Sequence, residues 1–151
     1  MFGIRFSIMF RLLITSLFGA LILANTSTAQ MIDDPEHKVV IQVSTADPLT
    51  QKIALNNAVN LQKILGLDNV AIEVVAYGPG LSILTPKSPE SHRIPDLALQ
   101  NITFSACGNT MKKVTKKTGS EPQLVEGVRV VPAGVIRIME LQQQGYAYIR
   151  P

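Results

Sequence analysis

Ile102-Thr103-Phe104-Ser105-Ala106-Cys107 runs directly into Gly108-Asn109-Thr110-Met111, so that a short apolar strand changes into a helix-permissive segment. In an α/β sheet, such a strand-to-helix turn lies at the carboxyl edge, where ligands and reactive groups gather. Cys107, the only cysteine of the chain, stands at this turn. Unpaired N–H groups and the positive end of the helix dipole favour its thiolate, which is the nucleophilic form.

A lone cysteine has a second interpretation. Unpaired cysteine is among the most buried residue types and usually behaves as a small hydrophobic side chain. The sequence therefore offers Cys107 either as a reactive thiol or as an inert part of the core, and it leaves both open.

The segments on either side of this turn alternate between strand and helix patterns. A helix is predicted from Asp47 and Pro48, which are helix-start residues, to Leu65, with Gly66 as its stop. A later apolar stripe (Val135, Ile138, Met139 and Leu141) predicts a second helix with its stripe in the core. The other predicted strands are Lys38–Ser44, Val70–Ala76, Gly127–Val131 and Tyr146–Ile149. This alternation predicts one three-layer α/β domain with a parallel five-stranded sheet.

The connection between the second and third strands is rich in glycine and proline. Glycines in Tyr77-Gly78-Pro79-Gly80 let the backbone approach something closely, although an ordinary tight turn explains them as well. Leu81–Leu84 can start a short helix. Thr85–Pro95, with three prolines, predicts an exposed loop that covers the site, and Asp96–Gln100 leaves room for little more than one helical turn.

Residues 1–29 have the pattern of a cleaved export signal. Arg5 and Arg11 precede an apolar run, Leu12–Leu23, and Ser27-Thr28-Ala29 supplies the small residues of a cleavage site. The apolar run is shorter than the roughly 20 residues of a membrane span, so no stable membrane insertion is expected after cleavage. We therefore predict a periplasmic or secreted protein with a flexible acidic start, residues 30–37.

The predicted mature chain is nearly neutral, since it keeps 12 of the 14 basic residues and all 11 acidic ones. This balance, with 5% aromatic residues, argues against nucleic acid as a partner. His37 and His92 are the only histidines, and neither has metal-ligand spacing to Cys107. The sequence contains no Cys-x-x-Cys pair, P-loop or Gly-x-Gly-x-x-Gly fingerprint, and we expect neither a metal nor a cofactor.

Five stretches together resemble the DsrE-like (DsrE/DsrF-like) sulfur relay family, over nearly the whole range from Lys38 to Pro151. They are Ala54–Leu61, Tyr77–Leu81, Ala106–Thr110, Val131–Val135 and Gly145–Ile149. The resemblance implies a flavodoxin-like sheet and a homotrimer or homohexamer, and in the best understood members a cysteine that carries a persulfide between proteins. Only Cys107 can take that role. Two features depart from the family pattern: the export signal, and the prolines that interrupt the helix before the cysteine strand.

The resulting functional hypothesis is a sulfur carrier in which Cys107 accepts sulfane sulfur from a donor and passes it to an acceptor protein or small thiol. The alternative is a non-catalytic oligomeric module that binds a small ligand or a protein. The residues expected to line the pocket around Cys107 are Tyr77, Gly78, Pro79, Gly80, Gly108, Asn109, Pro132, Ala133 and Gly134. Lysines 112, 113, 116 and 117 form either a solvated helix face or an attraction for anionic sulfur species.

Overall fold

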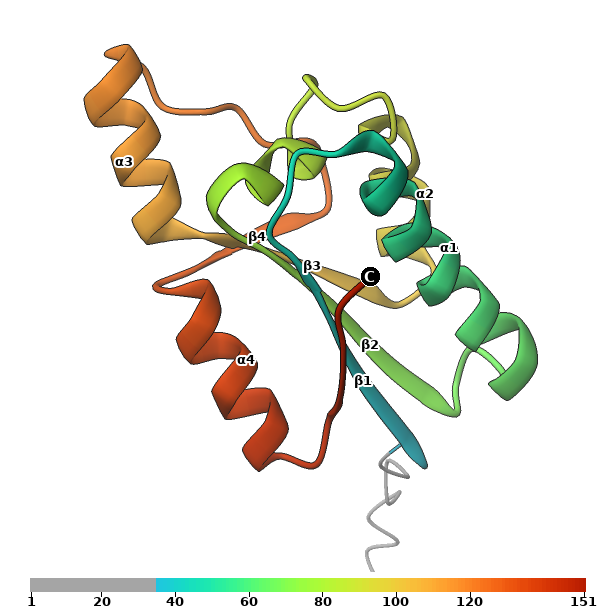
Figure 1. Ribbon diagram of the computed structural model, residues 1–151. Helices are drawn as coiled ribbons and strands as arrows, with labels where there is room; N and C mark the ends of the chain where they lie inside the picture. Colours follow the sequence, from blue (N-terminus) through green and yellow to red (C-terminus); the bar gives the residue numbers. More distant parts are fainter. Residues whose placement is uncertain (1–34) are drawn as a thin grey trace, which may run out of the picture. The chain divides into compact units, whose positions relative to one another are not determined.

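The computed structural model describes residues 35–151, which form one α/β domain (Figure 1). The export signal predicted for residues 1–29, and residues 30–34 of the predicted flexible start, lie outside the described residues. Within residues 35–151, no helix is both long enough and apolar enough to cross a membrane.

The domain is built on a parallel five-stranded sheet, as predicted. Its strand order is β4-β3-β2-β1-β5. The register pairs Val43 with Ala76 and Ala76 with Ala106, so the carboxyl ends of the three central strands share one edge. The strands are β1 (His37–Val43), β2 (Val70–Ala76), β3 (Ile102–Cys107), β4 (Val128–Val131) and β5 (Ala147–Ile149).

Helices cover both faces of the sheet, which confirms the three layers. The first three crossovers step in one direction across the sheet, and because such connections are right-handed, they share one face. The last crossover returns from β4 to β5 and places α4 on the other face (Figure 1). The helical elements are α1 (Pro48–Leu65), η1 (Gly78–Leu84), η2 (Ser91–Arg93), α2 (Ile94–Leu99), α3 (Gly108–Thr118) and α4 (Gly134–Gln143).

Local capping explains the bounds of α1. The carboxylate of Asp47 accepts the N–H of Thr50 at 2.7 Å, and Pro48 occupies the first helical position, where no N–H is needed. Gly66 ends the helix with a φ of +95°, in the region that favours glycine. Both ends agree with the prediction, because these signals act within a few residues.

The face of the sheet under α1, α2 and η1 (the α1 face) carries the main hydrophobic core. Ile41, Leu55, Ile83 and Phe104 are fully buried there. Gly80 brings η1 directly against the end of β1: a Cβ on Gly80 would lie 2.2 Å from the carbonyl oxygen of Val43. The predicted close backbone approach therefore exists, and its partner is the chain itself.

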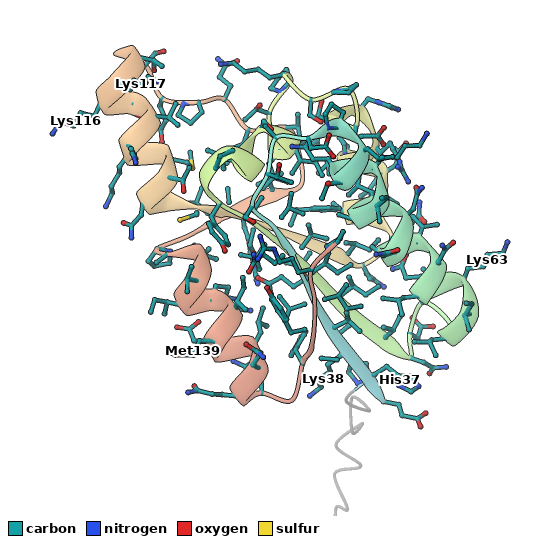
Figure 2. All side chains as sticks on the ribbon, viewed as in Figure 1. His37, Lys38, Lys63, Lys116, Lys117 and Met139 are labelled. Atoms are coloured by element: carbon teal, nitrogen blue, oxygen red, sulfur yellow. The ribbon has the colours of Figure 1, made fainter. Side chains whose placement is uncertain are left out.

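The opposite face of the sheet (the α4 face) has a much smaller apolar cluster. Ile138 and Leu141 of α4 pack on Val40 and Val75. The predicted apolar stripe is wrong in part, because Val135 and Met139 of that stripe are 59% and 47% exposed. Only α4 covers this face among residues 35–151, and the side of α4 that faces away from the sheet is exposed. Figure 2 shows Met139 on that side of α4.

The segment Thr85–Pro95 is only in part the exposed loop that its composition predicted: Pro86, Lys87, Pro89 and His92 are exposed. Thr85, Ser88, Ser91 and Ile94 are buried in it. The Ser88 hydroxyl donates to the side-chain oxygen of Gln51, a buried residue of α1, at 2.7 Å. Hydrogen bonds of this kind allow polar residues to be buried. The predicted interruption of the helix by prolines is confirmed, since only η2 and the short α2 form here.

Candidate functional site

Cys107 is the last residue of β3 and the N-cap of α3. The residue is buried, with 6% of its surface exposed. The strand-to-helix turn predicted from the sequence is thus confirmed. The N–H groups of the first turn of α3 lack acceptors within the helix.

A second helix also begins beside Cys107. Gly134 is the first residue of α4, and a Cβ placed on it would lie 3.3 Å from Cβ of Cys107. The same Cβ would lie 3.1 Å from Cβ of Tyr77. Glycine at this position therefore lets the start of α4 contact both residues. Two helix N-termini, those of α3 and α4, converge on one thiol.

The surroundings of Cys107 favour its thiolate. Burial raises the pKa of the thiol, but hydrogen bonds from the Thr110 hydroxyl, the Gly134 N–H and the N–H groups of Thr110 and Asn109 outweigh it. The pKa of Cys107 consequently lies below its ordinary value. A lowered thiol pKa at a helix N-terminus is the usual condition of a nucleophilic cysteine.

Thr110 is a site residue that was not singled out from the sequence. Its Oγ1 accepts the backbone N–H of Gly78 at 2.9 Å. This contact occupies the oxygen as an acceptor and leaves the hydroxyl proton for the sulfur of Cys107. Thr110 stands in the first turn of α3, and its nearness to the predicted helix start at Cys107 was the available signal.

Several of the residues predicted to line the pocket lie at the turns beside Cys107. Gly108 lies against the turn after β4, where a Cβ on it would be 3.1 Å from the carbonyl oxygen of Val131. Asn109 donates its N–H to the carbonyl of Pro132 at 3.2 Å. Gly80 instead packs against the end of β1.

Two cavities flank the site, and Cys107 lines neither. The first, of about 480 Å³, lies between η1, α3 and the loops that follow them, and Gly78 and Pro79 line it. The second, of about 420 Å³, lies between β4 and α4, and Pro132 and Ala133 line it. Of the nine residues predicted to line one pocket, four therefore line two separate cavities, and the other five line neither.

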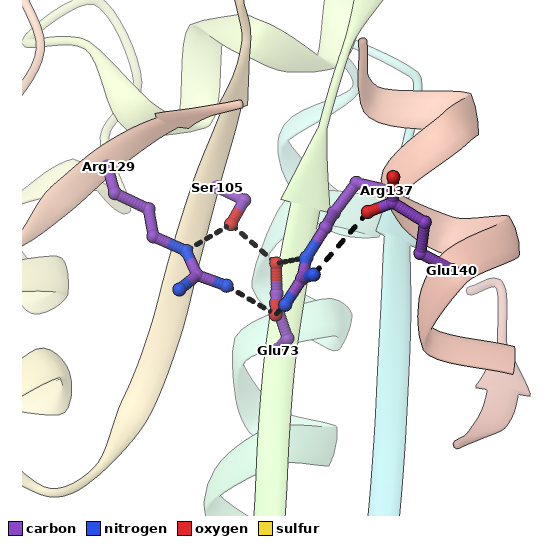
Figure 3. Close-up of polar contacts among 5 residues, drawn as sticks. All are labelled: Glu73, Ser105, Arg129, Arg137 and Glu140. Carbon is purple, nitrogen blue, oxygen red and sulfur yellow. Dashed lines mark hydrogen bonds and ion pairs between the residues drawn. The ribbon is translucent and has the colours of Figure 1, made fainter. Parts of the chain in front are cut away.

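An ion cluster centred on Glu73 lies on the α4 face, and sequence reasoning missed it (Figure 3). The Glu73 carboxylate accepts hydrogen bonds from Ser105 at 2.6 Å, from Arg129 of β4 at 2.7 Å, and from Arg137 of α4 at 2.9 and 2.8 Å. Burial raises the pKa of Glu73, but these donors hold it below its ordinary value. The sequence signal for this cluster was one charged residue in each of two otherwise apolar strands, Glu73 in β2 and Arg129 in β4.

The other polar candidates lie away from Cys107 or have ordinary partners. Within residues 35–151, no group of three or more histidine, cysteine or acidic side chains could hold a metal ion. His92 pairs through Nδ1 with the carbonyl of Pro89. The four lysines of α3 are exposed, which fits the solvated face, and Figure 2 shows Lys116 and Lys117 pointing away from the sheet.

The fold and its turn define a class: a single-domain, flavodoxin-like parallel α/β protein with a cysteine at the carboxyl edge of the sheet. Residues 37–151 match the DsrE/DsrF-like family, and the chain belongs to this family, whose members are generally sulfur relay proteins. A solved structure, of a protein of unknown function from Methanobacterium thermoautotrophicum, is 36% identical with a TM-score of 0.68; the match covers 76% of this chain and 99% of that one. No curated protein matches the chain.

Proposed function

We propose that Cys107 accepts sulfane sulfur from a donor and relays it as a persulfide. The observation that carries the proposal is the convergence of two helix N-termini on a thiol whose pKa is lowered. Membership of a family of sulfur relay proteins supports it independently. The same N–H donors that stabilise a thiolate can stabilise a persulfide anion, because both carry their charge on sulfur.

The reaction needs no oxidant. The Cys107 thiolate attacks the outer sulfur of a donor R–S–S⁻, the donor S–S bond breaks, and R–S⁻ leaves with the bonding electron pair. An acceptor thiolate then attacks the outer sulfur of Cys107–S–S⁻, which breaks the new S–S bond and restores the Cys107 thiolate. At 6% exposure, Cys107 admits a terminal sulfur atom more readily than a bulky group.

The compartment and the assembly of the protein are part of this proposal. The signal pattern of residues 1–29 supports a periplasmic or secreted location, in which an unpaired thiol is exposed to oxidants. Exposed apolar side chains on the outer side of α4 and on β4 support a homotrimer or homohexamer. These side chains are Val130, Val135, Ile136 and Met139.

Intact-protein mass spectrometry tests the relay. After treatment with a polysulfide, the wild type should gain about 32 Da, one sulfur atom at the thiolate, and lose it with dithiothreitol. Cys107→Ser is the matched control and should gain nothing. If the wild type stays unlabelled while iodoacetamide alkylates its thiol freely, the relay proposal fails.

The cavity of about 480 Å³ favours a second candidate function, a binding module for a small ligand or peptide. Its volume lies in the range of small-molecule sites. Cys107 does not line it, so binding there needs no covalent chemistry. A ligand that protects Ser82 and Val114 from hydrogen exchange equally in the wild type and in Cys107→Ser would support this function over the relay.

A further inference from the structure

Few side chains attach the N-terminal turn of α4 to the sheet. The apolar contacts of this helix come from Ile138 and Leu141, beyond its first turn. In the first turn, Val135 and Ile136 are exposed at 59% and 49%. Gly134 packs closely against Tyr77 and Cys107 but has no side chain, so Arg137 supplies the side-chain hydrogen bonds between this turn and the sheet.

Arg137 makes the contact that such an attachment requires. Its Nε and Nη2 donate to the two oxygens of Glu73 at 2.9 and 2.8 Å (Figure 3). Two parallel bonds fix the orientation of a guanidinium as well as its position. Its remaining ion pair, to Glu140 at 3.5 Å, lies within α4 and cannot hold the helix to the sheet.

Glu73 is a rigid anchor for this contact. It stands in the middle of β2, with its side chain 4% exposed. The Ser105 hydroxyl and Arg129 bind the same carboxylate from β3 and β4. With these donors in place, the carboxylate has little freedom to follow a movement of α4.

We propose that the Glu73–Arg137 ion pair is a positioning device that holds the N-terminus of α4 against Cys107 and thereby sets the reactivity of the thiol from outside the site. Arg137 lies three residues after Gly134, less than one helical turn away. The ion pair that holds Arg137 on the sheet therefore also fixes the position of Gly134. The inference uses the thiolate of the proposed function. It concerns only the reactivity of the Cys107 thiolate, which the rate of alkylation measures without any sulfur donor.

Arg129 provides a matched control. It binds Oε2 of Glu73 at 2.7 Å and the Ser105 hydroxyl at 3.0 Å, but it comes from β4, and both of these partners lie in the sheet. Arg129→Gln and Arg137→Gln each remove one guanidinium from the same carboxylate. Only Arg137→Gln releases the helix that begins beside Cys107.

The experiment is the pH–rate profile of iodoacetamide alkylation for the wild type and both variants, with folding checked by circular dichroism. Arg137→Gln should slow alkylation at neutral pH by about three- to fivefold, the effect of losing one helix terminus near a charge. Arg129→Gln should change it by less than about twofold, the size of a surface effect. Gly134→Ala, which pushes the helix start away directly, should shift the profile in the same direction as Arg137→Gln.

Equal rates for Arg137→Gln and Arg129→Gln would overturn the inference, and so would a slower rate in Arg129→Gln alone. If Arg137→Gln does not fold, Arg137→Lys and Arg129→Lys give the same comparison, because lysine keeps the charge and loses the two-bond geometry. A shifted alkylation profile without persulfide in the wild type would refute the relay and keep the positioning role. If the wild type forms a persulfide while the alkylation profiles of the variants match that of the wild type, the relay would stand and the positioning role would be refuted.

Discussion

The two faces of the sheet are built by different physics. The α1 face buries a continuous aliphatic core around Ile41, Leu55 and Phe104. The α4 face buries only a small apolar cluster, and beside it stands a carboxylate held by two arginines. Apolar burial is non-directional, whereas a charge-assisted hydrogen bond fixes an angle and a distance.

This difference separates the source of the stability of the domain from the source of the exact position of α4. The aliphatic face can supply most of the free energy of folding without specifying where one helix end lies within an ångström. The polar face supplies less free energy, because a buried ion pair must offset its own desolvation. It fixes the start of α4, which contributes an N–H donor to Cys107.

The largest expected effect is on the α1 face. Leu55→Ala removes a fully buried side chain of α1 and should lower the free energy of unfolding by about 2–5 kcal/mol, through lost transfer energy and a new cavity. Urea unfolding measures it. Leu49→Ala in the same helix is the control: Leu49 is 64% exposed, and its loss should cost less than about 0.5 kcal/mol. Similar losses for both variants would contradict the assigned core.

The next effect is on the α4 face. Glu73→Gln keeps the shape of the side chain and removes its charge, so the free energy of unfolding should fall by about 1.5–3 kcal/mol, the range for hydrogen bonds to charged groups. Chemical denaturation at pH 7 measures this change. A loss larger than that of Leu55→Ala would break the contrast between the two faces, because the polar face would then carry more of the stability.

The same carboxylate predicts a pH dependence. The folded-state pKa of Glu73 is lowered, so its stabilising contribution is fully present above the ordinary pKa of a glutamate, about 4.3. This contribution is lost as the pH falls from there through the folded-state pKa. Thermal unfolding between neutral and acidic pH should therefore show a smaller loss of stability in Glu73→Gln than in the wild type. Parallel curves would show that Glu73 is not held ionised.

A smaller effect is expected where the two faces meet, at the edge with Cys107. Thr110→Val removes the hydroxyl that binds the sulfur, so the thiol pKa should rise and alkylation at neutral pH should slow by about three- to tenfold. Stability should fall by only about 1 kcal/mol, for the lost acceptor of the Gly78 N–H. Thr110→Ser keeps the hydroxyl and should retain the wild-type rate; a slow Thr110→Ser would point to packing instead.

The smallest effect is expected at the exposed end of α3. Lys116 and Lys117 lie at the far end of α3, about 14 Å or more of helix from Cys107, beyond the Debye length of about 8 Å at physiological salt. Replacing both with glutamine should change stability by less than about 0.5 kcal/mol. The ratio of iodoacetate to iodoacetamide rates should stay within about twofold. A larger fall in this ratio would show that these lysines attract anions to the thiol.

The site shows the limit of the sequence most clearly. The turn at Cys107 was predictable, because a strand, a glycine and a helix pattern follow one another within a few residues. The approach of Gly134 to Cys107 was not, because 26 residues of chain separate them and their contact depends on which face α4 covers. The role of Glu73 was hidden for the same reason: its partners come from β3, β4 and α4.

The sequence by itself determined the alternation of strands and helices, the ends of α1 at Asp47 and Gly66, and the place of Cys107 at a helix start. These features follow from backbone geometry and capping over a few residues. Only the tertiary structure decided the strand order, the burial of Ser88 and Ser91, and the exposure of Val135 and Met139. Apolar periodicity records which residues prefer burial, but the element that covers them is selected by packing across the whole domain.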